Sequence, residues 1–131
     1  KFTHKNNCSL WFAEKALGHI QHDLLGSMII EKWGVSPIIE KVARWHHTYS
    51  KGSRFLVDDP KIHKLIDIVM IANHMIKELR FGNSGSAEIE ELPSAFLRRR
   101  RMNEEEYVST REAVRMQIDA ESENLAILLN G

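Results

Sequence analysis

The stretch ALGHIQHDLLGSMIIEKWGVSPIIEKVARWHH, residues 16–47, decides the fold of this chain. Its apolar residues recur with the 3.6-residue period of an amphipathic helix on both sides of a short turn. We expect the first helix to begin near Ile20 and to end at Gly34, because glycine tolerates the left-handed conformation found just past a helix C-terminus. Ser36 as N-cap and Pro37 at the first helical position then start a second helix. The stretch therefore predicts a helical hairpin.

Each helix of the predicted hairpin carries an apolar face and a histidine. The apolar residues are Leu24, Leu25, Met28, Ile29 and Trp33 in the first helix, and Ile38, Ile39, Val42 and Trp45 in the second. His22 lies one turn before the first face and His46 one turn after the second, so both histidines are expected to point toward the core. Gly26, one turn after His22, is expected to let another group approach that histidine closely. A glycine that merely permits tight helix crossing is an equally good interpretation.

Weaker signals predict further helices before and after the hairpin. Residues 1–7 are polar and are expected to form a frayed lead-in, and residues 8–17 a short helix that packs on the hairpin. After a loop that breaks the periodicity, the next helix is expected to run from Pro60 to about Leu79. One of the two aspartates that precede Pro60 is its N-cap.

The C-terminal part of the chain predicts two more helices after a polar loop at residues 81–91. Pro93 opens a short helix that is expected to extend through Arg101. Asn103 and Glu106 form a capping box for a last helix of about 25 residues. Its apolar face consists of Tyr107, Val114, Ile118, Leu125 and Leu128. Because no segment shows the alternation typical of strands, the predicted fold class is all-α, a bundle of about five to six helices.

Composition indicates an ordinary globular domain. The 131 residues are 43% hydrophobic and 27% charged, enough for one domain with its own core. We expect a central helical core at residues 8–80 and C-terminal helices at residues 92–130. The 18 basic and 18 acidic residues balance, so there is no net electrostatic attraction toward nucleic acid or an anionic membrane. No apolar run approaches the length of a bilayer span, and the single Cys8 excludes an intrachain disulfide, which together favour the cytoplasm.

The opening stretch resembles the second half of an HDOD domain. The matching residues are Leu17-Gly18, His22 with Gly26, Trp33-Gly34, Pro37 and His46-His47, followed by Ala72-Asn73 at the end of an apolar helix. The resemblance covers residues 8–130. It implies an HD-superfamily-like helical bundle of which this chain is the C-terminal part, with an N-terminal half upstream of Lys1. HDOD domains are signalling modules related to metal-dependent phosphohydrolases and are generally regarded as having lost catalysis.

The resemblance also identifies a candidate pocket. In metal-using HD relatives, histidines at the places of His22, His46 and His47 and an aspartate at the place of Asn73 help to hold two metal ions. Asn73 is neutral and a much weaker ligand, so we expect a relict pocket of these four residues, no catalytic residue and no cofactor. If a divalent metal binds, its ligands are the three histidines. On sequence alone, Asn73 is equally a buried amide bonded to the backbone.

Three other features suggest sites but carry less weight. His22-Asp23 together with Asp67 imitates the His-Asp signature of the metal-dependent HD enzymes. However, Asp23 is expected to be a first-turn carboxylate that the helix dipole favours. Asp67 is expected to lie off the apolar stripe of its helix. The run Arg98, Arg99, Arg100 and Arg101 could contact phosphates, but on a helix its members fan out and the following glutamates offset them. The sequence GNSGS at residues 82–86 lacks the lysine and the preceding strand of a phosphate-binding loop.

Two functions therefore compete, with a third behind them. The first is a non-catalytic signalling or regulatory module that acts through protein contacts, with a small ligand in the relict pocket. The alternative is a metal-dependent phosphohydrolase acting on a nucleotide or cyclic dinucleotide. A nucleic-acid contact through the arginine run at residues 98–101 is the weakest. We expect the last helix to pack on the N-terminal half of the domain or on a second copy of the chain.

Overall fold

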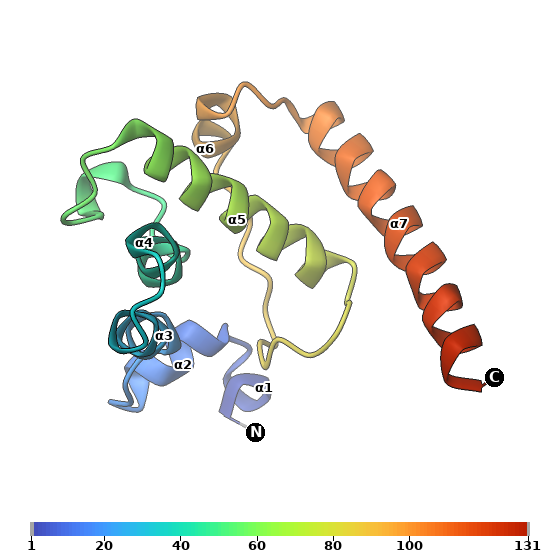
Figure 1. The fold of residues 1–131 in the computed structure, drawn as a ribbon, viewed down its shortest axis with the longest axis horizontal. Helices are drawn as coiled ribbons and strands as arrows, with labels where there is room; N and C mark the ends of the chain where they lie inside the picture. The colour runs from blue at the N-terminus through green and yellow to red at the C-terminus, as the bar shows by residue number, and fades with distance from the viewer. Residues whose placement is uncertain (1, 131) are drawn as a thin grey trace. The chain divides into compact units, whose positions relative to one another are not determined.

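The computed structural model describes residues 2–130 of the chain, and the side chains of residues 2–122. Over this range the fold is all-α, as predicted, and contains no strand. The chain divides into two compact units, Lys1–Leu92 and Pro93–Gly131. The first contains α1 (Phe2–Asn6), α2 (Leu10–Ala16), α3 (His22–Lys32), α4 (Pro37–Trp45), a 3₁₀ turn (Lys51–Ser53) and α5 (Pro60–Glu78), and the second contains α6 (Ser94–Arg99) and α7 (Glu104–Asn130) (Figure 1).

Local capping contacts start α4 and α5 where the sequence predicts them, whereas α3 begins at His22 and not near Ile20. Gly34 adopts a φ of +65° after α3. The Ser36 hydroxyl accepts the backbone N–H of Ile38 at 3.3 Å and so caps α4. Asp59 does the same for α5, because its Oδ1 accepts the N–H of Lys61 at 2.8 Å.

The second unit begins with the short helix α6 and continues with α7. The capping box of α7 is formed in both directions: Asn103 Oδ1 accepts the N–H of Glu106 at 2.8 Å, and Glu106 Oε2 accepts the N–H of Asn103 at 2.9 Å. Of the apolar face predicted for α7, Tyr107 is buried, and Val114 and Ile118 are half-buried. Leu125 and Leu128 lie outside the described side chains.

In the first unit, α4 packs between α3 and α5 (Figure 1). The core residues of this unit come mainly from α5, which supplies Ile66, Met70, Ile71 and Met75, and are joined by Cys8, Ala13 and Val57. The segment after α5 returns to the start of α2, where the Ala87 N–H donates to the Cys8 carbonyl at 3.1 Å and Ser86 Oγ accepts the N–H of Leu10 at 3.0 Å. The predicted loop at residues 81–91 therefore belongs to this unit, where it forms one wall of the candidate functional site.

A fully buried ion pair joins α5 to the loop before it. Arg54 Nη2 donates to Asp67 Oδ1 at 2.6 Å, and both side chains are 0% exposed. Arg54 also donates through Nε to the Thr48 carbonyl at 2.8 Å, which fixes the path of the chain after α4. The prediction that Asp67 lies off the buried face was wrong, because Arg54 compensates its charge inside the core.

The apolar faces predicted to point inward on α3 and α4 are largely exposed instead. The only buried residues of α3 are Asp23 and Ser27, and α4 contains none among its described residues. Among the described residues of this unit, α3 packs mainly on α4, and α4 packs also on α5, so the other sides of the two helices stay exposed. At the N-terminus the structure is more ordered than predicted. The residues that were expected to fray form the helix α1, and Thr3 is buried.

Within the part of the chain that the structure describes, no helix combines the length and apolar character needed to cross a lipid bilayer.

Candidate functional site

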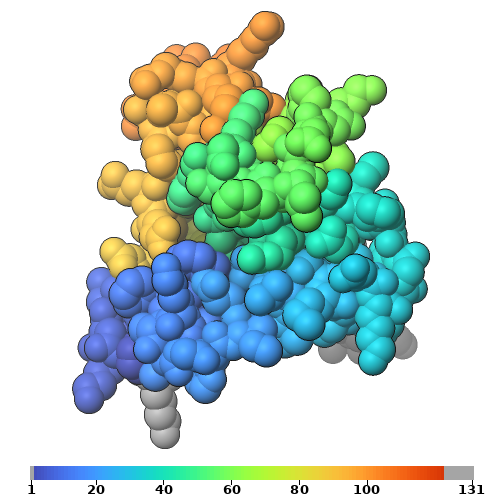
Figure 2. Space-filling view, turned by 90° about the vertical axis from the view of Figure 1, so that its left-hand side faces the viewer, coloured from blue at the N-terminus to red at the C-terminus, as the bar shows by residue number. Residues whose placement is uncertain are grey.

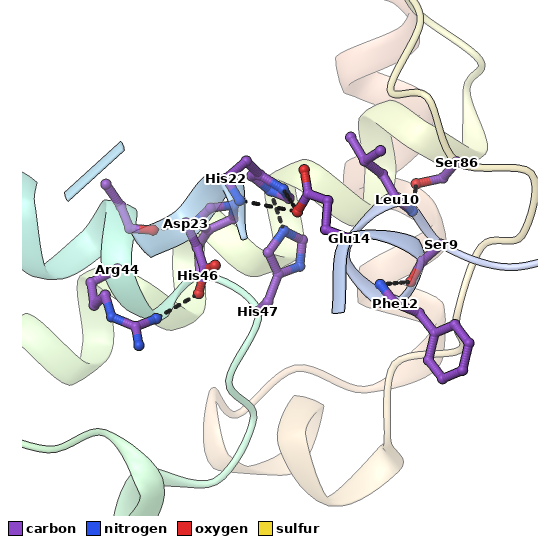
Figure 3. A network of polar contacts seen from close by, with 11 residues as sticks. Ser9, Leu10, Phe12, Glu14, His22, Asp23, Arg44, His46, His47 and Ser86 are labelled. Atoms are coloured by element: carbon purple, nitrogen blue, oxygen red, sulfur yellow. Dashed lines mark hydrogen bonds and ion pairs between the residues drawn. The ribbon is translucent and has the colours of Figure 1, made fainter. Parts of the chain in front are cut away.

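Three histidines meet where α3 begins and α4 ends. His22 is the first residue of α3, whereas His46 and His47 directly follow the last residue of α4. The glycine turn folds the two helices against each other, which brings the start of one beside the end of the other. One nitrogen atom from each of the three rings lies within 4.8 Å of the other two. Figure 3 shows His22 and His47 facing each other at this point.

Glu14, at the end of α2, holds His22 in place. The His22 Nδ1–H donates to Glu14 Oε2 at 2.8 Å, and the same oxygen accepts the His22 backbone N–H at 3.0 Å (Figure 3). Glu14 therefore also caps α3, whose own N-cap residue, Gln21, makes no side-chain capping bond. Sequence analysis missed Glu14, because its partner lies eight residues away across a change of helix.

The remaining ring nitrogens are oriented by two further hydrogen bonds. The His46 Nδ1–H donates to the Ala43 carbonyl at 2.7 Å, which leaves the His46 Nε2 lone pair available. The Nε2 atoms of His22 and His47 are 2.9 Å apart. When His22 is neutral with its proton on Nδ1, its Nε2 accepts, so His47 Nε2–H is the donor. Outer partners that fix ring orientation in this way are typical of histidines that bind metals.

The three imidazoles line a hollow of about 220 Å³ together with two residues of α5, Asn73 and Lys77. We call it the histidine hollow. The structure thus brings together the four residues singled out by the sequence. Asn73 differs from the expected buried amide: it is half-buried and makes no hydrogen bond to a described residue. Lys77, one turn further along α5, was not recognised from the sequence.

Burial changes the ionisation of the groups in this hollow. Desolvation, reinforced by the neighbouring His46 and His22, lowers the pKa of His47 to about 3. Desolvation also lowers the pKa of His46, against the effect of its bond to the Ala43 carbonyl. Burial lowers the pKa of Lys77 as well, and the carboxylate of Glu90 opposes this. His46 and His47 are therefore neutral near pH 7, the form in which imidazole binds metals.

The ligand set fits one metal ion better than two. Among the described residues, only the three histidines bring three ligand atoms together, and no carboxylate joins them. Asp23 is committed to Arg44 at 2.8 Å, and Asp67 to Arg54. Glu90 lies on an adjoining hollow, where its Oε1 accepts the hydroxyl proton of Ser9 at 2.9 Å. A dinuclear centre needs bridging anionic oxygen, which this arrangement does not supply.

Two further predictions concern residues that do not reach the histidine hollow. The arginine run lies in the second unit, where Arg98 donates to Ser94 Oγ at 3.4 Å and the guanidinium of Arg99 lies 4.9 Å from the centre of the Phe96 ring. Arg98 and Arg101 are exposed, whereas Arg99 and Arg100 are half-buried. The prediction of a close approach at Gly26 was wrong, because a Cβ added there would meet nothing within 4 Å.

No protein-family model, curated protein or solved structure matches this chain.

Proposed function

We propose that this chain is a non-catalytic regulatory module of the HDOD type, which acts through protein contacts in the cytoplasm. The observation that carries the proposal is the composition of the histidine hollow. Three imidazoles, an amide and an ammonium group line it, and no carboxylate does so among the described residues. A relict of a metal centre, retaining its histidines but not its anionic ligand, would have this composition.

Electrostatics argues against two metal ions in this hollow. Two dications need anionic oxygen to balance and bridge them. Asn73 supplies only an uncharged amide oxygen, and the ammonium of Lys77 adds a positive charge on the same wall. Dinuclear phosphoester hydrolysis therefore lacks both its bridging ligand and its charge balance.

The surface of the α3–α4 hairpin supports action through protein contacts. We call it the hairpin face; Figure 2 shows its light-blue to cyan atoms at the surface. Its exposed apolar residues are Leu24, Leu25, Met28, Ile29, Trp33, Val35, Ile38 and Ile39. Trp33 alone is 76% exposed. Grouped apolar exposure of this kind marks contact surfaces in soluble proteins. The occupant we propose is a protein segment, either the N-terminal half of an HDOD domain or a partner protein.

Metal analysis together with a hydrolysis assay tests the proposal. We expect the purified protein to contain no stoichiometric metal and to leave a generic phosphodiester intact with added Mn²⁺. Asn73→Asp replaces the amide by a carboxylate of the same size and so supplies an anionic ligand. A gain of metal binding in this variant alone would support the proposal that an ancestral metal site was disabled at this position. Tightly bound metal in the wild type, with turnover that His22→Ala abolishes, would overturn the proposal.

The alternative is a metal-dependent phosphohydrolase acting on a nucleotide or cyclic dinucleotide. It is favoured by the bond between Glu14 and His22, because a carboxylate on the far nitrogen of a ligating histidine strengthens that ligand. His22, His46 and His47 would then hold one ion. The same assay separates the two functions, since only the alternative predicts turnover in the wild type.

A further inference from the structure

A second hollow adjoins the histidine hollow on the side of the loop that follows α5. This loop hollow has a volume of about 500 Å³ and shares four wall residues with its neighbour: Asn73, Lys77, Ser84 and Ser86. It adds Arg80, in the turn after α5. The two hollows together thus present two cationic side chains, and none of their described wall residues is a carboxylate.

Neither cation is neutralised by a close partner. Lys77 and Arg80 form no ion pair or hydrogen bond with a described side chain. Glu90 acts on Lys77 only at longer range, and its carboxylate is bonded to Ser9. A half-buried lysine normally keeps its ammonium group in water. Lys77 lines both hollows and Arg80 lines the loop hollow, so an anion that entered them would meet two positive charges.

The two serines line both hollows, and each already uses its hydroxyl oxygen as an acceptor. Ser86 Oγ already accepts the N–H of Leu10 at 3.0 Å, and Ser84 Oγ accepts the N–H of Ser86 at 3.3 Å. With an oxygen lone pair used in each case, the hydroxyl protons remain to be donated. The amide N–H₂ of Asn73 provides two more donors, since it bonds to no described residue.

We infer that these two hollows form a metal-free binding site for an oxyanion of the phosphate type, held by Lys77, Arg80, Asn73, Ser84 and Ser86. Phosphate fits this wall better than a carboxylate does, because its tetrahedral oxygens can accept from several directions at once. The GNSGS sequence thus contributes hydroxyl groups without being a phosphate-binding loop of the strand–helix type. The inference rests on the proposed function in one respect, namely that no metal centre occupies the histidine hollow.

Calorimetric titration with inorganic phosphate, in EDTA and at constant ionic strength, tests the inference. We expect saturable binding that weakens by about tenfold or more in Lys77→Gln, because a charge-assisted bond is lost. Asn73→Asp should weaken binding as much, by placing a like charge beside the anion. Lys64→Gln is the matched control, since Lys64 is an exposed lysine of the same helix, and it should leave the affinity unchanged.

Four results would overturn the inference: no saturable binding at millimolar phosphate, equal affinity in Lys77→Gln, binding only after Mn²⁺ is added, or acetate binding as tightly as phosphate. Arg80→Gln, at an exposed position, provides a second variant if Lys77→Gln does not fold. Failure to bind phosphate would leave the regulatory proposal standing, because that proposal is judged by metal content and hydrolysis.

Discussion

The Nε2 atoms of His22 and His47 lie 2.9 Å apart, at hydrogen-bond distance. Two imidazole ligands of one tetrahedral zinc ion would be about 3.3 Å apart, given zinc–nitrogen bonds of about 2.0–2.1 Å. The rings are thus arranged to share a proton, and a metal ion would have to displace that proton and separate them. Because His47 is neutral near pH 7, the shared proton is its own Nε2–H, and metal binding would move it to Nδ1 of the same ring.

The free energy of unfolding in the absence of metal should fall on acidification, because burial keeps His47 neutral in the folded protein. The pKa of His47 is about 3 in the folded protein and about 6.5 when unfolded, so the unfolded state binds more protons between these values. The contribution of His47 to the free energy of unfolding is therefore complete above about pH 6.5. It is lost as the pH falls toward 3, at up to about 1.4 kcal/mol per pH unit. Urea unfolding in EDTA from pH 7.5 to 5 measures it. His47→Gln should flatten the slope, and an unchanged slope in this variant would contradict the assignment.

Glu14→Ala should destabilise the protein by about 1–3 kcal/mol. The substitution removes the acceptor for two donors of His22, its backbone N–H and its ring Nδ1–H. The Glu14 side chain is only 17% exposed, so water replaces it incompletely. Chemical denaturation measures the loss, with Glu31→Ala on the exposed side of α3 as the control, expected within about 0.5 kcal/mol of wild type. Equal effects of the two substitutions would show that the Glu14 contact does not stabilise α3.

Asp67→Ala should cost about 3–5 kcal/mol, because it removes the carboxylate that is paired with the buried Arg54 guanidinium. The double variant Arg54→Met with Asp67→Leu should recover most of that loss, since it removes both charges and keeps apolar volume. Asp58→Ala, an exposed aspartate of the preceding loop, is the matched control. A double variant less stable than Asp67→Ala would mean that the hydrogen bonds of Arg54 matter more than charge compensation.

Trp33→Lys should change the unfolding free energy by no more than about 0.5 kcal/mol, because the side chain is mostly exposed. It should nevertheless reduce the binding of a hydrophobic dye and any concentration-dependent light scattering, since it interrupts the hairpin face. Leu56→Lys places the same charge at an exposed apolar residue outside this face. Similar effects of both substitutions would argue against a defined contact surface.

Helix limits in this chain could be predicted because their signals are local. The caps Ser36 and Asp59, and the Asn103 capping box, each act within a few residues of their own position. The convergence of His22 with His46 could also be expected, since one short turn separates their helices. These features follow from sequence spacing alone.

What could not be predicted depends on contacts between distant segments. Periodicity shows that α3 and α4 each have an apolar face, but not whether another element covers it, and Trp33 proves exposed. Lys77 reads as an ordinary helix lysine until the loop with Ser84 and Ser86 folds over it. Asp67 reads as a surface charge until Arg54 is brought to it through an irregular loop.

The buried pair of Arg54 and Asp67 also limits how this protein can evolve. A lineage that lost either charge first would pass through an intermediate with an uncompensated ion in its core. Positions 54 and 67 should therefore covary among homologues, both charged or both apolar, with few sequences in between. The exposed arginine at position 98 faces no such constraint and should drift freely.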